Sequence, residues 1–303
     1  MNVLITGATG LVGRNLSKLL TGKGHSVVPL VRGKRQAGLP WWDPAGGKID
    51  LSPCKHLDAV VHLAGENVAG RWTEKRKKNI RDSRVDGTKL LAEALAALRS
   101  PPRTFLQASA VGYYGNRGDE MLDEGSDSGS GFLADTCVAW EAAGEAAEMA
   151  RIRRVRMRIG VVLTPEGGAL KRMLPPFRFG LGGPVGSGRQ YVPWISLHDV
   201  VSAIEFLLTD SAVSGVVNLT APVPATQKEM AGALGRSLNR PAFLPLPAFV
   251  VEKLFGEMGK DLLLSSTRAL PKRLMEAGFD FRDSSLDDSM SRILATPPPA
   301  AQP

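Results

Sequence analysis

Gly7-Ala8-Thr9-Gly10-Leu11-Val12-Gly13 is the stretch that decides the fold. It follows an apolar, strand-like segment, residues 2–6, and opens an amphipathic, helix-like segment, residues 11–20. Glycines permit a tight turn, and the N-terminus of the helix offers unpaired N–H groups and its positive dipole end to a pyrophosphate. An ordinary turn that happens to be rich in glycine is the alternative, but three glycines in register between a strand and a helix disfavour it. The stretch therefore predicts a turn that binds a dinucleotide.

Strand-like and helix-like segments continue to alternate beyond this turn. The expected strands are residues 2–6, 26–31, 59–63, 104–108 and 155–163, and the expected helices are residues 11–20, 86–98 and 133–150. Such alternation implies right-handed βαβ crossovers and a parallel sheet with helices on both faces. We therefore predict an α/β fold, a Rossmann-type doubly wound parallel sheet with a smaller, mainly helical C-terminal lobe.

The character of the chain changes at Pro165, where glycines and prolines become frequent. A helix is expected to open at residues 194–201, a strand is expected at residues 215–219, and residues 226–295 look mainly helical. We expect an NADP-binding Rossmann domain over residues 1–164 and about 191–222, and a substrate-binding C-terminal lobe over residues 165–190 and about 223–295. The last stretch, residues 296–303, holds four prolines and is expected to be a disordered tail.

The composition is that of a soluble globular protein, with 303 residues, 43% hydrophobic and 22% charged. No leader-like segment follows Met1, and no apolar run approaches the roughly 20 residues that spanning a bilayer requires, so we expect a cytoplasmic protein without a membrane partner. Cys54 and Cys137 lie far apart and form no metal-ligand pattern. We therefore expect a reducing compartment and no metal site.

The net charge of +8 raises the question of nucleic-acid binding. The basic residues fall in short runs, around residues 75–78 and over residues 151–158, and the second run continues with the alternation of a strand at a sheet rim. An anionic cofactor accounts for part of the same excess, so nucleic-acid binding ranks low among the functions considered.

The end of the second expected strand bears on which dinucleotide is bound. An acidic residue there would bind the ribose 2′-hydroxyl of NAD and repel a 2′-phosphate. Here Val31 is followed by Arg32, Lys34 and Arg35, and no carboxylate competes. Arg32 is expected to hold the 2′-phosphate through charge-assisted hydrogen bonds, with a solvated loop charge as the alternative. The sequence therefore favours NADP(H) as the cofactor.

The next expected strand ends in a turn of small residues, Leu63-Ala64-Gly65. A backbone that passes close to a cofactor needs such a turn. We interpret His62, at the end of the strand, as a packed residue rather than a catalyst. Glu66 and Asn67 follow at the place where a nicotinamide ring is expected.

These elements together resemble the extended short-chain dehydrogenase/reductases, whose members include sugar-nucleotide epimerases and dehydratases. More narrowly, residues 1–295 resemble the atypical epimerase family proteins of the YfcH type, including the C-terminal module of that family at residues 241–294. The stretches that carry the resemblance are Ala64-Gly65-Glu66-Asn67, Ser109-Ala110-Val111-Gly112-Tyr113-Tyr114-Gly115, Pro176-Phe177-Arg178-Phe179-Gly180-Leu181-Gly182-Gly183 and Pro193-Trp194-Ile195. Together with the glycine turn, the resemblance implies a set of cofactor contacts: Gly7, Thr9, Gly10, Leu11, Val12, Gly13, Val31, Arg32, Leu63, Ala64, Gly65, Arg84 and Val162.

The wider class performs its chemistry with a YxxxK pair, in which the Lys lowers the pKa of the Tyr phenol so that it passes a proton as hydride moves. This chain contains no YxxxK. Anchoring the expected helix on Glu141 places Leu133 at the Tyr position and Cys137 at the Lys position. Leu has no proton to give, and we interpret Cys137 as a buried helix residue rather than a nucleophile.

Three residues remain as candidate catalytic groups. Ser109, at the end of an expected strand, fits the position that polarises a substrate oxygen. Tyr113 and Tyr114 are the nearest phenols, and each is either a substitute acid or a packing residue of its loop. Arg178 and Arg189 are candidates for binding a substrate phosphate or carboxylate, with a solvated surface charge as the alternative.

The leading hypothesis is an NADP(H)-binding, epimerase-like oxidoreductase that acts on a carbonyl, alcohol or nucleotide-sugar-like substrate, in a cleft expected between the carboxyl edge of the sheet and the smaller lobe. The missing YxxxK leaves open whether the protein turns over. The alternative is a regulatory or scaffold protein that binds NADP(H) without turnover, for which the resemblance allows a link to cell division. The expected partner is a small-molecule substrate.

Overall fold

The computed structural model describes residues 1–295, and the expected disordered tail at residues 296–303 lies outside the described residues. The chain forms two compact units. The first comprises residues 1–113, 130–158 and 201–217, and the second comprises residues 114–129, 159–200 and 218–295. The functional lobes expected from the sequence divide the chain at other positions, and they stay a prediction.

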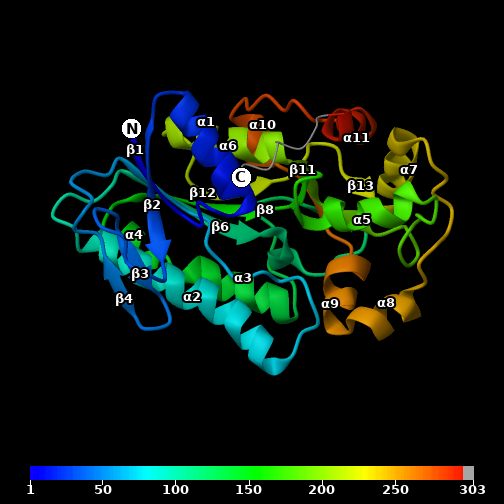
Figure 1. Cartoon of the computed structure of the whole chain (residues 1–303), viewed down its shortest axis with the longest axis horizontal. Coiled ribbons are helices and arrows are strands. Elements are labelled where there is room, and N and C mark those ends of the chain that lie inside the picture. The colour runs from blue at the N-terminus through cyan, green and yellow to red at the C-terminus, as the bar shows by residue number, and fades with distance from the viewer. Residues whose placement is uncertain (296–303) are drawn as a thin grey trace. The chain divides into compact units, whose positions relative to one another are not determined.

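The first unit is built on an eight-stranded sheet with the order β12-β8-β6-β5-β1-β2-β3-β4 (Figure 1). Strand β1 pairs in parallel with β2 and β5, β5 pairs in parallel with β6, and β4 joins the edge strand β3 in antiparallel fashion. The strands are β1 (Asn2–Thr6), β2 (Ser26–Arg32), β3 (Trp41–Asp43), β4 (Lys48–Asp50), β5 (Ala59–His62), β6 (Thr104–Ala110), β8 (Arg153–Ile159) and β12 (Gly215–Leu219). The predicted parallel-dominated α/β sheet is confirmed.

Helices cover both faces of this sheet. Figure 1 shows α1 and α6 on one face and α2, α3 and α4 on the other. The helices are α1 (Leu11–Gly22), α2 (Glu74–Ala96), α3 (Phe132–Ala142), α4 (Glu145–Met149) and α6 (Leu197–Thr209), and a 3₁₀ turn, η1, spans Val111–Tyr114. The doubly wound arrangement is therefore confirmed. Within residues 1–295, no helix is both long and apolar enough to cross a membrane.

Helix α2 begins well before the expected residue 86. Thr73 caps its N-terminus by accepting a hydrogen bond from the Arg76 N–H at 3.2 Å, and two lysines of the basic run that follows form ion pairs along the helix. Lys77 contacts Glu74 at 2.9 Å, and Lys78 pairs with Asp82. The first turns lack an apolar stripe because most of their side chains face solvent. Hydrophobic periodicity therefore did not predict this part of the helix.

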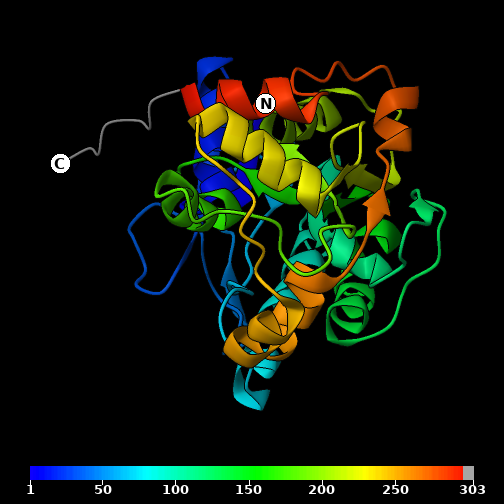
Figure 2. The same cartoon turned by 90° about the vertical axis from the view of Figure 1, so that its right-hand side faces the viewer.

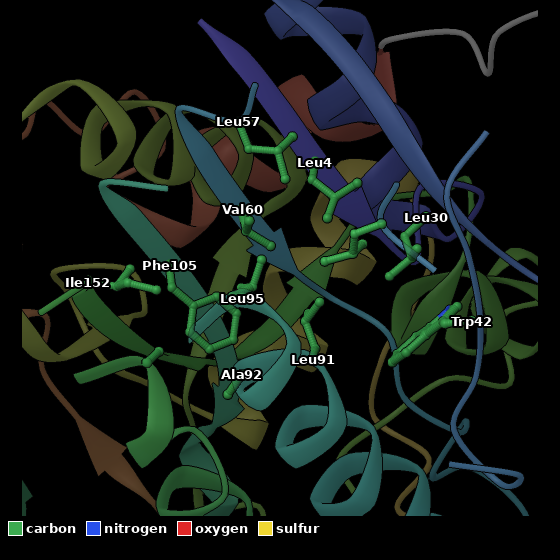
Figure 3. Packing of buried hydrophobic residues seen from close by; sticks show 12 residues of the cluster. Leu4, Leu30, Trp42, Leu57, Val60, Leu91, Ala92, Leu95, Phe105 and Ile152 are labelled. Atoms are coloured by element: carbon green, nitrogen blue, oxygen red, sulfur yellow. The ribbon is translucent and has the colours of Figure 1, made fainter. Parts of the chain in front are cut away.

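The sheet edge holds a hairpin, β3–β4, that the sequence analysis did not predict. Each strand has three residues, too few to show an alternating pattern. The hairpin matters for packing because the indole of Trp42 is 2% exposed and joins the core under β1, β2, β5 and β6. Figure 3 shows Trp42 beside Leu30 and Leu91 in this cluster. Gly87 on α2 lies against the indole, since a Cβ atom there would be in ordinary van der Waals contact, 3.5 Å from the Trp42 ring.

Two expectations about residues 133–163 were wrong. The single helix expected over residues 133–150 is broken at Gly144, where a Cβ atom would overlap Gln107 Oε1. Strand β8 does not lie at a rim, because it is flanked by β6 and β12. Its Arg154 and Arg158 are buried, 4% and 3% exposed, and they pair with Glu148 and Glu141. Part of the basic run is therefore internal.

The second unit contains short strands and several helices. Helices α7 and α11 lie side by side (Figure 2), and Ser237 Oγ lies 3.2 Å from Ser291 Oγ between them. The segment at Trp194, expected to open a helix, is instead strand β11, which pairs with β9 before α6 begins. The elements are β7 (Met121–Leu122), β9 (Val161–Leu163), α5 (Gly168–Arg178), β10 (Tyr191–Val192), β11 (Trp194–Ser196), β13 (Ala225–Thr226), α7 (Gln227–Leu238), α8 (Ala248–Phe255), α9 (Glu257–Gly259), a π turn (Lys260–Leu264), β14 (Arg268–Ala269), α10 (Lys272–Glu276) and α11 (Leu286–Ala295).

Candidate functional site

The glycine turn joins the carboxyl end of β1 to α1. Gly7 has a φ of +68°, and a Cβ atom there would lie 3.0 Å from the Ala64 nitrogen, so the turn is closely packed against the end of β5. A Cβ atom on Gly13 would overlap the carbonyl oxygen of Gly7. Gly10 is the N-cap of α1 and provides no side chain to cap the helix. The first N–H groups of α1 are therefore available to an anion.

The other predicted cofactor contacts of this turn are accessible to solvent, fully or in part. Thr9 and Gly10 are exposed, and Leu11 and Val12 are half-buried in the first turn of α1. Gly10 N donates to Gly7 O at 2.9 Å, which closes the turn between them. The structure therefore places these four residues around one helix N-terminus.

The end of β2 lies beside this turn. Thr6 is paired with Leu30, so Val31 and Arg32 reach beyond the end of β1. Arg32 is exposed. The next loop is braced by Trp41, whose Nε1 donates to Gly33 O at 2.6 Å and whose ring lies 4.5 Å from the Arg35 guanidinium. Because the carboxyl ends of parallel neighbours meet at one edge, Arg32 stands near the glycine turn.

The turn after β5 meets an arginine from α2. A Cβ atom on Gly65 would lie 3.3 Å from Arg84 Cζ, so glycine gives the guanidinium room. Arg84 donates from Nη1 to Glu66 O at 2.9 Å and stacks 5.0 Å over the Trp140 ring. Burial lowers the pKa of Arg84, but a guanidinium stays charged in proteins. A fixed, half-buried cation therefore lies against this turn.

His62 and Val162 are the two remaining residues that the sequence analysis discussed for this edge of the sheet. His62 is fully buried, and burial lowers its pKa to about 3, so it is a neutral packed residue, as interpreted from the sequence. Val162, a predicted cofactor contact, is half-buried in β9 of the second unit. The other predicted cofactor contacts all belong to the first unit.

Ser109 is part of a buried polar cluster. Its hydroxyl donates to Glu141 Oε1 at 2.7 Å, and Glu141 accepts from Arg158 Nε at 2.8 Å and from Nη2 at 3.0 Å. The Arg158 guanidinium in turn lies 3.3 Å from the centroid of the Tyr113 ring. Ser109 and Tyr113 are thus brought together through an ion pair that the sequence analysis did not identify. A glutamate and an arginine 17 residues apart give no local pattern to identify it.

The two candidate tyrosines differ in environment. Tyr113 is half-buried in the first unit, on the 3₁₀ turn after β6. Tyr114 is 0% exposed in the second unit, and its hydroxyl lies 2.9 Å from Asp123 O and 2.8 Å from Asn218 Oδ1. Both neighbours are acceptors, so the Tyr114 proton is used within the fold.

The helix positions that carry YxxxK in the wider class lie on α3. A Cβ atom on Gly112 would lie 3.4 Å from Leu133 Cβ and 3.9 Å from Cys137 Sγ, so this helix face packs on the turn after β6. Burial, reinforced by Glu141, raises the pKa of Cys137 to about 12. The thiol therefore stays protonated near neutral pH and does not act as a nucleophile.

The second unit holds the remaining charged candidates. Arg178 and Arg189 are exposed. His198, Asp199 and Asp283 bring ligand-type atoms within 4.8 Å of one another. However, Asp199 accepts the Asp283 N–H at 2.9 Å, and Asp283 pairs with Arg292 at 2.7 Å. These carboxylates serve the fold, and we assign no metal to them.

Known proteins resemble the chain over nearly its whole length. Residues 3–220 match the NAD dependent epimerase/dehydratase family, and residues 246–293 match DUF1731, a domain of unknown function. The epimerase family protein MT2273 of Mycobacterium tuberculosis is 42% identical over 297 residues, which cover 97% of this chain and 98% of the relative.

Two solved structures extend this likeness. The structure of human epimerase family protein SDR39U1 with NADPH has a TM-score of 0.88 and 36% identity, covering 97% of this chain and 99% of that one. A nucleoside-diphosphate sugar epimerase from Corynebacterium glutamicum has a TM-score of 0.78 and 34% identity, covering 97% and 58%. The narrower likeness to the YfcH type stays a prediction. The chain belongs to the NAD dependent epimerase/dehydratase family and carries a DUF1731 domain in its C-terminal part.

Proposed function

We propose that this protein binds NADP(H) at the carboxyl edge of the sheet of its first unit. The observation that carries the proposal is the packing of Gly7 and Gly13, where any side chain would meet backbone atoms of the two facing turns. Such a glycine cradle, open at a helix N-terminus, suits a pyrophosphate. The likeness to human SDR39U1, solved with NADPH, supports the same cofactor.

Arg32 accounts for the choice of the phosphorylated form. It is exposed at the end of β2, next to the glycine turn in the sheet order. A guanidinium there pairs with a 2′-phosphate through charge-assisted hydrogen bonds. Leu63, Ala64, Gly65 and Arg84 would line the cofactor at the neighbouring strand end.

We further propose an epimerase-like oxidoreductase that acts on a carbonyl, alcohol or nucleotide-sugar-like substrate. The chemistry that NADP(H) supplies when bound is hydride transfer. Tyr113 would pass the proton, because the Tyr114 hydroxyl is used within the fold. The Ser109 hydroxyl donates its hydrogen bond to Glu141, so towards a substrate it would act as a hydrogen-bond acceptor.

A specific observation favours a second candidate, an NADP(H)-binding protein without turnover. Leu133 and Cys137 replace the expected acid and cation on α3, and both face the turn at Gly112. The same cofactor site would then serve a regulatory or scaffold role, with occupancy as the signal.

Turnover distinguishes the two candidates. Carbonyl substrates and nucleotide sugars are screened for NADPH oxidation or NADP⁺ reduction with the wild type, Tyr113→Phe and Tyr114→Phe. An enzyme with Tyr113 as its acid loses at least about a hundredfold in kcat on Tyr113→Phe, the lower end of the usual range for general acid catalysis. Tyr114→Phe should instead lower stability. Turnover unchanged in Tyr113→Phe would remove that residue from the chemistry, and no turnover with tight NADPH binding would favour the second candidate.

A further inference from the structure

Beneath the glycine turn lies a chain of buried polar side chains from four elements of the first unit. Thr6 Oγ1 lies 2.7 Å from His62 Nδ1, and His62 Nε2 lies 2.9 Å from Thr88 Oγ1. Trp140 Nε1 donates to the same Thr88 oxygen at 2.9 Å. Thr6, His62 and Thr88 are each 0% exposed. The chain thus connects the ends of β1 and β5 to α2 and α3.

The hydrogen bonds in this chain have a defined direction. Thr6 Oγ1 accepts the N–H groups of Leu63 and Ala64, each at 3.1 Å, which uses both of its lone pairs. The Thr6 hydroxyl must therefore donate its hydrogen bond to His62 Nδ1. Because Nδ1 accepts, the neutral imidazole carries its proton on Nε2. His62 then donates to Thr88. Every polar atom of the imidazole is satisfied in one tautomer.

The Thr6 hydroxyl also sets the spacing of two backbone turns. It belongs to the residue just before Gly7, and it holds the two N–H groups that open the turn after β5. A Cβ atom on Gly7 would lie 3.0 Å from both the Ala64 nitrogen and the Leu63 carbonyl carbon. The two turns proposed to flank the cofactor are therefore held at a fixed and very short separation.

Two aromatic rings also pack against the imidazole of His62. Its ring lies edge-on to Trp42, with centroids 5.8 Å apart, and 6.2 Å from the Phe105 centroid. Because the imidazole stays neutral with a pKa of about 3, the direction of the hydrogen bonds does not change near neutral pH. Buried residues that touch no ligand themselves can in this way hold the ligand-binding backbone within the small positional tolerance that binding requires.

We propose that Thr6, His62 and Thr88 are positioning residues that set dinucleotide affinity by fixing the turn after β5 against the glycine turn. The inference rests on the proposed NADP(H) site and adds residues that touch no ligand themselves. It predicts a selective effect. Recognition of the 2′-phosphate at Arg32, on the other side of β1, should not depend on this chain.

The test compares two ligands on matched variants. Thr6→Val keeps the side-chain shape and removes the hydroxyl, and Thr6→Ser restores it. Thr136→Val is the control, because Thr136 Oγ1 is buried without a hydrogen-bond partner in the described chain. We expect Thr6→Val to raise the Kd for NADPH at least about tenfold, a change of about 1.4 kcal/mol. Thr6→Ser and Thr136→Val should bind like the wild type.

Adenosine 2′-monophosphate, which lacks the 5′-phosphate, the pyrophosphate and the nicotinamide and so keeps only the phosphate assigned to Arg32, should bind Thr6→Val as tightly as it binds the wild type. A general loss of structure would weaken both ligands equally, and that outcome overturns the positioning role. If Thr6→Val does not fold, Thr88→Val breaks the chain at its far end and should weaken NADPH selectively in the same way. If the wild-type protein binds no NADPH, the proposed function is refuted. If the wild-type protein binds NADPH and Thr6→Val or Thr88→Val binds it equally well, only this inference is refuted.

Discussion

The Ser109 hydroxyl donates to Glu141 Oε1 at 2.7 Å, and Glu141 is held by Arg158 in an ion pair whose side chains are 6% and 3% exposed. Ser109 therefore enters any reaction with its proton committed to a buried carboxylate. The same ion pair supports Tyr113 from below, since the Arg158 guanidinium faces its ring. The two candidate catalytic groups of the first unit thus depend on one buried pair.

Breaking this pair should be strongly destabilising. Glu141→Gln removes the charge that Arg158 needs, and an uncompensated buried guanidinium costs about 3 kcal/mol or more. Urea denaturation measures the loss. The matched control is Asp287→Asn, which breaks the exposed pair with Arg236 and should leave the midpoint nearly unchanged. Equal midpoints for wild type and Glu141→Gln would show that the pair does not hold this part of the fold.

Two glycines of the same helix should respond in opposite ways to alanine. In Gly13→Ala the new methyl group would overlap the Gly7 carbonyl oxygen, so the glycine turn must open and NADPH binding should fall at least about tenfold. In Gly22→Ala the methyl group meets nothing within 4 Å, and the higher helix propensity should stabilise α1 by up to about 1 kcal/mol. Calorimetric titration and thermal melts check both. Undiminished NADPH binding by Gly13→Ala would argue against the cradle.

Stability should fall as the pH drops through the acidic range because of His62. Its folded-state pKa of about 3 lies below the ordinary 6.5, so between these values the unfolded chain binds a proton that the folded chain does not. The stabilisation is complete above pH 6.5 and is lost towards pH 3, with a slope of at most about 1.4 kcal/mol per pH unit. Urea unfolding at several pH values measures it. His62→Asn should reduce the slope, and a slope equal to that of the wild type would contradict the burial of a neutral His62.

The sequence predicted the parts of the fold that are set by local pattern. The glycine turn and the strands β1, β2, β5 and β12 combine glycine spacing with short apolar runs, and each appears close to its expected bounds. The hairpin β3–β4 was not predicted, because three-residue strands carry no periodicity and Trp42 is buried by a contact with Gly87 on a distant helix.

The site was only partly predictable for the same reason. Arg32 could be identified from the sequence because the charge at the end of β2 indicates whether a 2′-hydroxyl or a 2′-phosphate is bound. Arg158 could not, because a run of arginines looks like a surface until its partner Glu141 is brought to it by folding. Likewise, nothing in the sequence indicates that Thr6 joins two turns through a single oxygen.

The preference of the first unit for NADP(H) over NAD(H) is proposed to come from Arg32. It is tested most directly by measuring the Kd of the wild type for NADPH and for NADH at one stated ionic strength, beside Arg32→Asp. We expect the wild type to bind NADPH at least about tenfold more tightly than NADH, as charge-assisted pairing with a phosphate implies, and Arg32→Asp to abolish or reverse the preference. Equal affinity of the wild type for the two dinucleotides, or binding of neither, would contradict it.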